Sequence, residues 1–533
     1  MSDKSPAPGD ELAILHTRIC TLLGDCKATA KSIKVARPSR RLSFEELNLM
    51  PPSRDMADKM IDLYFKFFES THRILHRPTF QSEYLGFWSD PQRVSNGARL
   101  KILLAVAIGS SVHAGSSEDF ELQTTVHGWV YAAQTWLSGP LEKDRLDMTG
   151  LQVYCLTILS RQIFSIGGDL VWVSTGSLLH TAMQIGMHRD PKHLPAMSVL
   201  QAEMRRRLWA TILEIAIQAS LDSAMPPRIS LDDFDTQAPS NNNDDEMTEH
   251  TTTLTPHPRQ TYTTASLQLQ LLDAVPTRLE ILRLLNGLHS QISYQDVLKL
   301  GRELSTAHQS CIRFMISNKN CGVEPFHRNI VDLLFRRFFI PMHYPFAMEA
   351  ATNPLFHFSR NAILDTALAI ASPEPDESYS RLMRIGGGMI REAIRYAISV
   401  ITFELLSQAT AQHLSGTLHR NSYQLEFLKT TVRDMISLSA ERVRAGETNI
   451  KGHMFLSMIM SQVEAMEADA PCDLDIARSA VSSLEYCLAI IRERAARSYL
   501  RSPRDGAFHS GSFASPDAIG LDFDFFLPDI DFE

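Results

Sequence analysis

The most informative part of the chain reads Ile185-Gly-Met-His-Arg-Asp-Pro191, Arg205-Arg-Arg-Leu-Trp209, Ser223-Ala-Met-Pro-Pro227 and Asp232-Asp-Phe-Asp235. Two predicted helices bracket these residues. Apolar residues recur at helical spacing from Trp172 to Met187, which indicates one buried helix face. A second helix is expected to begin at Ser198, because Ser198 and Gln201 have the spacing of a capping box. It should end before Pro226, since proline lacks the amide hydrogen that a helix needs.

The patterns elsewhere are also helical, and no alternating run predicts a convincing strand. We therefore expect an all-α fold, a large multi-helix domain with disordered N- and C-terminal tails. Helices are predicted at about 11–30, 54–70, 100–108, 122–137, 267–287, 294–316, 327–350, 358–371, 385–410, 412–445, 450–468 and 472–497.

Composition narrows the class of protein. The formal net charge is −9 over 533 residues, so the whole chain offers no net basic surface to DNA phosphates. Seven cysteines are scattered along the sequence, a pattern typical of a reducing compartment and not of a disulfide framework. No apolar run reaches the length of a membrane span, and the N-terminus has no signal-peptide pattern. We expect a soluble intracellular protein.

The order of these motifs resembles the fungal-specific regulatory domain, the middle homology region of fungal zinc binuclear-cluster transcription factors. The resemblance covers roughly residues 43–487 and includes His76-Arg-Pro-Thr-Phe80 and Asn353-Pro-Leu-Phe-His357 with Ser359-Arg360. It implies a structural role for His76, Pro78, Phe80, Trp172, Gly186, His188, Arg189, Arg206, Arg207, Trp209, Pro226, Asp233 and Asp235.

The sequence departs from the family pattern at two positions. The family usually has glycine where Ala224 stands, and often has aspartate where Ala216 stands. Without a glycine, the turn at Ala224 either needs no positive φ or is strained.

Composition and the family resemblance together divide the chain into five expected segments. Residues 1–42 form a polar and basic segment that is partly disordered, and its loosely spaced lysines and arginines favour a linker over a nuclear-import signal. Residues 43–246 form the first half of the regulatory domain. The Asn-, Thr- and Pro-rich residues 247–266 predict a disordered insert. Residues 267–500 form the helical second half, and residues 501–533 form an acidic-aromatic tail.

The family's N-terminal zinc cluster is not expected in this chain. Such a cluster needs six cysteines, with pairs spaced C-x2-C, to hold two zinc ions. Cys20 and Cys26 are the only cysteines before Cys155, and two thiols cannot complete a tetrahedral site. The chain itself is therefore predicted to need no cofactor, and zinc is expected only if a longer form carries the cluster.

Several short motifs point elsewhere but lack their usual context. His72 and His76 have metal-ligand spacing without a third ligand, so packing histidines are the favoured interpretation. Consecutive arginines at 205–207 fan around a helix and cannot all face one nucleic-acid backbone. Glu203 lies three and four residues before Arg206 and Arg207, which favours structural ion pairs. His188-Arg189-Asp190 lacks the other kinase motifs, and Gly386-Gly-Gly388 lacks a P-loop lysine.

The tail after Asp517 alternates acidic and aromatic or aliphatic residues and contains no lysine or arginine. Acidic groups keep apolar side chains in solvent, where they can dock into a partner's groove. This pattern favours a transcriptional activation segment over an inert or self-packed tail. Its candidate residues are Asp522, Phe523, Asp524, Phe525, Phe526, Leu527, Asp529, Ile530, Asp531 and Phe532.

The resemblance implies a nuclear transcriptional regulator, not an enzyme, that controls a metabolic or secondary-metabolite gene cluster. It would reach DNA through a DNA-bound partner or a longer isoform, and would recruit a coactivator or the general transcription machinery through the tail. A homo- or heterodimer and a small-molecule effector are further expectations, whereas a membrane is not. A ligand sensor or dominant-negative co-regulator without DNA binding is the alternative, and a helical enzyme is a remote one.

Overall fold

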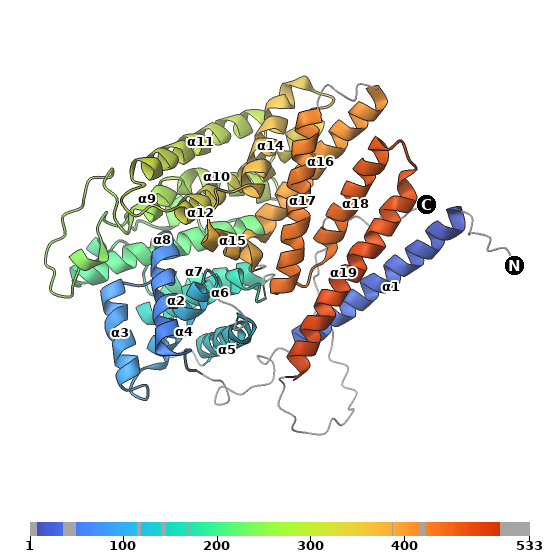
Figure 1. Ribbon diagram of the computed structural model, residues 1–533. Coiled ribbons are helices and arrows are strands. Elements are labelled where there is room, and N and C mark those ends of the chain that lie inside the picture. Colours follow the sequence, from blue (N-terminus) through green and yellow to red (C-terminus); the bar gives the residue numbers. More distant parts are fainter. Residues whose placement is uncertain are drawn as a thin grey trace.

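The computed structural model describes residues 8–35, 49–113, 119–139, 145–167, 170–385, 387–415 and 422–500. Within these ranges, regular structure consists of α-helices and short 3-10 helices, and no strand occurs (Figure 1). The predicted all-α fold is therefore confirmed for the described chain. The candidate activation segment at 522–532 lies outside the described residues.

The helices of the first half of the chain pack around α4 and α6. These helices are α2 (Arg54–Phe67), α3 (Arg77–Ser89), α4 (Asn96–Ser110), α5 (Asp119–Ser138), α6 (Met148–Ile163), α7 (Val171–Gln184) and α8 (Val199–Asp222). From Ile102 to Gly109, helix α4 is apolar around its whole circumference and fully buried, as expected of a helix segment without a polar face. The helix packs against α2, α5 and α6. At Gly109 it approaches α2 so closely that an added Cβ would lie 1.8 Å from the Met60 carbonyl oxygen.

The second half continues the same core. Its helices are α9 (Ser266–Asp273), α10 (Val275–Asn286), α11 (Tyr294–Ser317), α12 (Pro325–Arg336), α13 (Phe339–Glu349), α14 (His357–Ala371), α15 (Glu377–Arg384), α16 (Gly388–Ser415), α17 (Ser422–Ala445), α18 (Lys451–Glu467) and α19 (Cys472–Leu500). One hydrophobic cluster contains residues of both halves. Phe67 of α2 and Phe326 of α12, for example, have ring centroids 4.4 Å apart.

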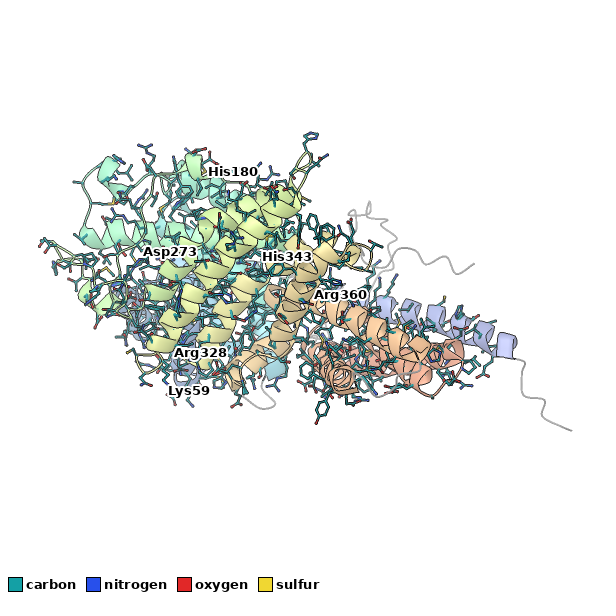
Figure 2. All side chains as sticks on the ribbon, turned by 90° about the horizontal axis from the view of Figure 1, so that it is seen from above. Lys59, His180, Asp273, Arg328, His343 and Arg360 are labelled. Atoms are coloured by element: carbon teal, nitrogen blue, oxygen red, sulfur yellow. The ribbon has the colours of Figure 1, made fainter. Side chains whose placement is uncertain are left out.

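The N-terminal helix α1 (Pro8–Val35) lies outside this core, beside α19. Seen from above, α1 runs along the helices of the C-terminal region and extends past the rest of the molecule (Figure 2).

Helix α8 forms as the sequence predicts. The Ser198 hydroxyl accepts a hydrogen bond from the Gln201 amide at 3.1 Å, and the Ser198 amide donates to the Gln201 side chain at 3.4 Å. This capping box opens the helix, and α8 ends at Asp222, before Pro226. From Leu208 to Leu221 every residue of α8 is buried, so the helix needs partners for its polar side chains as well as for its apolar ones.

Some predicted helices are divided in the structure. The helix expected at 267–287 breaks at Ala274, because Pro276 in the first turn of α10 has no amide hydrogen for the preceding turn. The helix expected at 327–350 divides into α12 and α13, and Pro341 lies in the first turn of α13. The sequence patterns do not predict helices α3, α6 and α15.

Residues 247–265, which belong to the segment predicted as a disordered insert, form irregular chain between a 3-10 helix and the α-helix α9. Three carbonyl oxygens of this segment accept hydrogen bonds from buried amides: Asn241 donates to Pro258 and Thr261, and Asn242 donates to Thr255, each at 2.9–3.0 Å. The polar residues of this segment are therefore held by hydrogen bonds from Asn241 and Asn242. These contacts cannot be recognised from the composition of the segment alone.

Candidate functional site

Hydrogen bonds of two aspartates, Asp190 and Asp235, join the chain segments before and after α8. The Asp190 carboxylate accepts two hydrogen bonds from the Arg206 guanidinium at 2.9 and 3.0 Å and one from the Gln237 amide at 3.0 Å. The Asp190 amide donates to Asp235 at 2.7 Å, and the Asp235 amide donates to the His188 carbonyl at 3.0 Å. Burial alone would raise the pKa of Asp190, but these donors hold it well below its usual range.

The tight turn that delivers Asp190 depends on Gly186, whose φ is +76° and therefore lies in the region that favours glycine. The neighbouring motif residues stay near the surface. Arg189 is about half exposed and pairs with Asp235 at 3.3 Å. Asp233 accepts a hydrogen bond from the Ser230 amide at 2.7 Å and so caps a short 3-10 helix.

The three consecutive arginines of α8 have three different partners. Arg205 donates to the carbonyl oxygen that follows α7. Arg207 pairs with Glu203 at 3.0 Å, the predicted i,i+4 ion pair. Arg206 does not form the predicted pair with Glu203. Consecutive helix residues point about 100° apart, so the Arg206 side chain points away from that of Arg207 and pairs with Asp190. All three arginines therefore make contacts within the fold.

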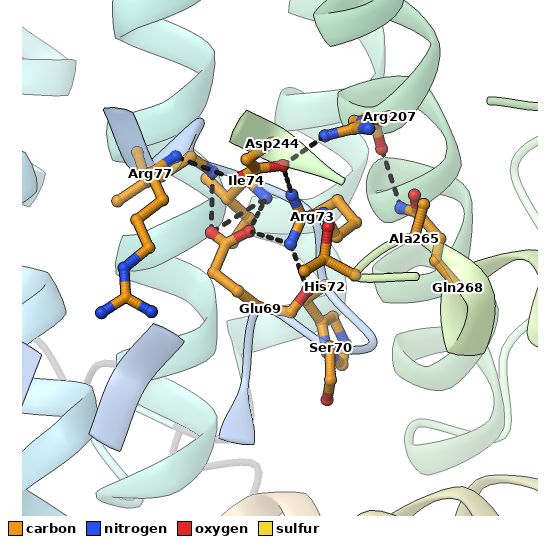
Figure 3. A network of polar contacts seen from close by, with 12 residues as sticks. Glu69, Ser70, His72, Arg73, Ile74, Arg77, Arg207, Asp244, Ala265 and Gln268 are labelled. Carbon is orange, nitrogen blue, oxygen red and sulfur yellow. Dashed lines mark hydrogen bonds and ion pairs between the residues drawn. The ribbon is translucent and has the colours of Figure 1, made fainter. Parts of the chain in front are cut away.

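Arg207 belongs to a buried charge cluster in which Asp244 joins it to Arg73 (Figure 3). Its Nη1 lies 2.6 Å from Asp244 Oδ1, and its Nη2 donates to the Asn242 carbonyl at 3.0 Å. Asp244 also pairs with Arg73 and accepts the Arg77 amide at 2.9 Å. Although burial raises the pKa of Asp244, the two guanidiniums outweigh it and the pKa is lowered.

Glu69 completes the cluster from the loop between α2 and α3. Its carboxylate accepts the Leu75 amide at 2.7 Å and the Tyr64 hydroxyl at 2.5 Å, and lies 3.8 Å from Arg73. The side chain is fully buried. Burial raises the pKa of Glu69 to about 7, against the opposing charge of Arg73. Two guanidiniums therefore face three buried carboxyl groups, those of Glu69, Asp244 and Glu203.

Further along α8, the same helix face makes a series of buried polar contacts. The Gln268 amide of α9 donates to the Arg207 carbonyl and to Thr211, both at 2.9 Å. Glu214 forms a bidentate pair with Arg278 of α10 at 2.7 and 2.8 Å. We call this face, from Glu203 to Asp222, the polar spine. Its last members are Gln218 and Asp222, which both contact Arg337.

The remaining motif residues pack around the spine. Trp209 is buried with its ring centroid 5.7 Å from that of Phe234. Trp172 of α7 is covered by the Arg228 guanidinium at 4.5 Å. Pro78 lies in the first turn of α3, and Phe80 is buried. Two residues before Pro226, Ala224 has a φ of +49°, so the turn adopts the strained alternative that its missing glycine suggested.

No metal centre was found in the described parts of the chain. His76 caps α3 and contacts Thr79 at 2.8 Å and the Asp244 carbonyl at 2.9 Å, while His72 contacts Thr71 at 2.9 Å. Two surface hollows have volumes of about 430 and 310 Å³, at the lower end of small-ligand sites. The first is lined by polar residues of α9–α11, and the second lies among α14–α17.

The second-half motif residues form a separate contact group. His343 of α13 lies 2.9 Å from the Ser359 hydroxyl, and burial lowers the pKa of His343 to about 4. Arg360 pairs with Glu404 of α16 at 2.9 Å. These contacts join α13, α14 and α16.

Sequence reasoning missed Glu69, Arg73 and Asp244, which lie far from Arg207 along the chain. The one available signal was their residue type: charged residues that follow the amphipathic helix α2 and the asparagine run at 241–243.

Comparison with known proteins identifies the region that contains this cluster. The fungal specific transcription factor domain matches residues 61–304. The transcription factor asR3 of Sarocladium schorii is 41% identical and aligns with 94% of this chain and 66% of its own length. For the transcription factor opdR of Penicillium oxalicum the values are 32%, 96% and 67%. The aspyridones cluster regulator apdR of Emericella nidulans is 30% identical over 76% of this chain and 57% of its own length.

The chain thus spans about two thirds of the length of the first two relatives. No solved structure matches it. The matched domain and the named relatives all belong to fungal transcription factors. This chain therefore belongs to the family of fungal transcription factors that carry the fungal specific transcription factor domain.

Proposed function

We propose that the chain regulates transcription of a fungal secondary-metabolite gene cluster. The observation that carries this proposal is the 32% identity to opdR along nearly the whole chain, together with the domain at residues 61–304. Similar proteins include the cluster regulators of aspyridones, fusarisetin A and equisetin, as their names state. Transcription factors are not enzymes. Each buried charged side chain of the polar spine also makes a structural contact within the fold.

The same region is proposed to be the regulatory part of the protein, acting in the nucleus. With a net charge of −9 over its 533 residues, the whole chain is a poor ligand for phosphates by itself. We therefore propose that it reaches DNA through a DNA-bound partner or as part of a longer form that carries the zinc cluster. A small-molecule effector and a homo- or heterodimer partner remain proposals from the family resemblance. None of the described helices has the length and apolarity to cross a membrane.

The tail is proposed to recruit a coactivator. Its aromatic residues alternate with acidic ones, a composition that suits docking of an extended or helical segment into an apolar groove. Acidic residues alone would give a weak, salt-sensitive contact, so the phenylalanines should supply most of the binding free energy.

A reporter assay tests the tail directly. Residues 501–533 are fused to a heterologous DNA-binding domain, and reporter output is compared with a variant in which Phe523, Phe525 and Phe526 become alanine. The proposal expects output to fall by about tenfold or more, equivalent to about 1.4 kcal/mol of lost binding free energy. The matched control changes Phe508 and Phe513, which lie outside the acidic run, and should retain output. Equal output from all three fusions would reject the aromatic docking mechanism.

A further inference from the structure

Thr255 and Pro256 lie in an exposed part of the chain between α8 and α9, which runs along the edge of the molecule (Figure 1). Residues 251–258 are free of helix and turn. Prolines at 256 and 258 keep this run out of helix, because the residue before a proline is biased towards extended conformations. The Thr255 hydroxyl has no hydrogen-bond partner among the described residues. Thr255 therefore presents a free hydroxyl on an irregular, accessible segment.

A threonine followed by proline is the acceptor of proline-directed protein kinases. Proline lacks the amide hydrogen, so a kinase groove without an acceptor at this position favours it, since any other residue would bury an unpaired amide. In the reaction, the Thr255 hydroxyl oxygen forms a bond with the γ-phosphorus of ATP. The bond from this phosphorus to the β,γ-bridging oxygen breaks, ADP leaves with the electron pair, and the hydroxyl proton passes to the catalytic aspartate of the kinase. The acceptor must lie on a segment that a groove can bind in extended form.

A second dipeptide of this kind, Ser372-Pro373, gives a comparison within the described chain. Ser372 follows α14 directly, and its amide donates to the Leu368 carbonyl at 2.9 Å. Two residues later, the backbone of Glu374 exchanges two hydrogen bonds with the Asn329 side chain, at 2.8 and 3.0 Å. The residues before Ser372 are therefore helical, and those after it are fixed to α12. Neither restraint applies to the run around Thr255, which makes Thr255 the more accessible acceptor.

The side-chain nitrogen of Asn242 joins Thr255 to a carboxylate. It donates to the Thr255 carbonyl at 3.0 Å and to Glu246 at 2.6 Å. Glu246 also accepts from Asn243 at 3.0 Å and lies 2.9 Å from His257. Burial raises the pKa of Glu246, but these partners outweigh it and the pKa is lowered. A charged carboxylate therefore lies beside the backbone of Thr255.

A phosphate on Thr255 opposes these contacts. It adds about 1.5 to 2 negative charges, and a phosphate beside an acidic residue disrupts structure through like-charge repulsion. It also competes with Glu246 for His257, which lies two residues from the acceptor. Both effects weaken the hydrogen bonds through which Glu246 and Asn242 hold the segment.

The same segment covers part of the buried charge cluster. Met247 is buried with Leu200 and Met204 at the start of α8, and Leu254 packs on this group. The Met247 sulfur lies 3.9 Å from Arg207 Nη2. Release of the segment would therefore admit water to a guanidinium that is fully buried in the unmodified chain.

We propose that Thr255 is a phosphorylation site for a proline-directed kinase, and that its phosphate releases residues 247–258 from α8. The proposal goes beyond the role in transcription and does not depend on it, because it rests on the conformation and the contacts of this segment alone.

The first measurement is site occupancy. The full chain is incubated with a purified mitogen-activated protein kinase and magnesium ATP, and phosphate is quantified by mass spectrometry of peptides. Each serine or threonine that precedes a proline is counted separately: Ser5, Thr255, Ser372, Ser502 and Ser515. We expect occupancy at Thr255 to exceed that at Ser372 about tenfold, because only the first lies on a segment without helix. Pro256→Ala should lower occupancy at Thr255 about tenfold. Occupancy at Thr255 no higher than at Ser372, or unchanged by Pro256→Ala, would overturn the assignment.

The second measurement is hydrogen exchange of the amides in residues 247–258. The native chain and Thr255→Val, which keeps the side-chain shape but accepts no phosphate, are both treated with the kinase, and each is compared with its own untreated sample. Treatment should speed exchange about tenfold in the native chain and leave it unchanged in the variant. The variant corrects for phosphate at the other sites, and residues 372–376 should exchange alike in all samples. Unchanged exchange of residues 247–258 in a chain with phosphate on Thr255 would overturn the release.

Discussion

Arg207 and Asp244 form a buried ion pair, with Nη1 and Oδ1 2.6 Å apart and both side chains more than nine-tenths buried. The pair connects the middle of the matched domain to a segment 37 residues further along the chain. Arg73 also pairs with Asp244, and Glu203 also pairs with Arg207. Arg207 and Asp244 therefore each have two partners of opposite charge. Removing one member strands the others away from water, which is far more costly than losing an exposed pair.

Replacement of Arg207 by methionine should therefore destabilise the fold strongly. We expect a loss of about 3–5 kcal/mol in the free energy of unfolding, because Asp244 and Glu203 lose a buried counter-charge. Urea denaturation followed by circular dichroism measures the loss. Arg189→Met is the matched control, since Arg189 belongs to the same motif region but is half exposed, and its effect should be small. Similar losses for both variants would contradict the importance of the buried cluster.

Glu69 should make stability depend on pH. Its pKa is about 7 in the folded chain, raised by burial, and about 4.3 when unfolded. Between these values the folded state holds a proton that the unfolded state has released, so the free energy of unfolding falls as pH rises. Relative to Glu69→Gln, which cannot titrate, the native chain should lose up to about 1.4 kcal/mol per pH unit in this window. A constant difference between the two proteins from pH 4.5 to 7 would show that Glu69 titrates alike in both states.

Ala224→Gly should stabilise the protein. Ala224 has a φ of +49° and is exposed, so glycine relieves backbone strain without removing buried surface. Strain relief of about 1–2 kcal/mol exceeds the entropic cost of glycine, about 0.5–1 kcal/mol. We expect a net gain of about 0.5–1 kcal/mol. Ala202→Gly, within the regular part of α8, should instead cost about 0.5–1 kcal/mol. Thermal unfolding of the two variants distinguishes these opposite signs, and a loss at both positions would refute the strain.

Local signals in the sequence predicted local structure well. The capping box at Ser198 and Gln201 fixes the start of α8, and the Glu203–Arg207 pair follows from i,i+4 spacing. Helix breaks were harder to place, because the prolines at 276 and 341 lie inside otherwise continuous apolar patterns. The resemblance predicted which motifs matter, but not their contacts.

The buried cluster itself could not be predicted from spacing. Asp190 replaces Glu203 as the partner of Arg206, and Asp244 brings together Arg73 and Arg207 across 171 and 37 residues of sequence. Such contacts depend on how whole helices pack, and a charged residue in a loop has no periodicity that marks it as buried.

Transcript sequencing of a strain that lacks this protein tests the central claim most directly. Deletion of the gene and its re-expression are compared under conditions in which the fungus produces secondary metabolites. The account predicts that transcripts of one contiguous set of biosynthetic genes change at least tenfold on deletion and recover when the native chain is restored. Unchanged transcripts across every biosynthetic gene cluster, in cells where the protein is shown to be present before deletion, would contradict a role in their regulation.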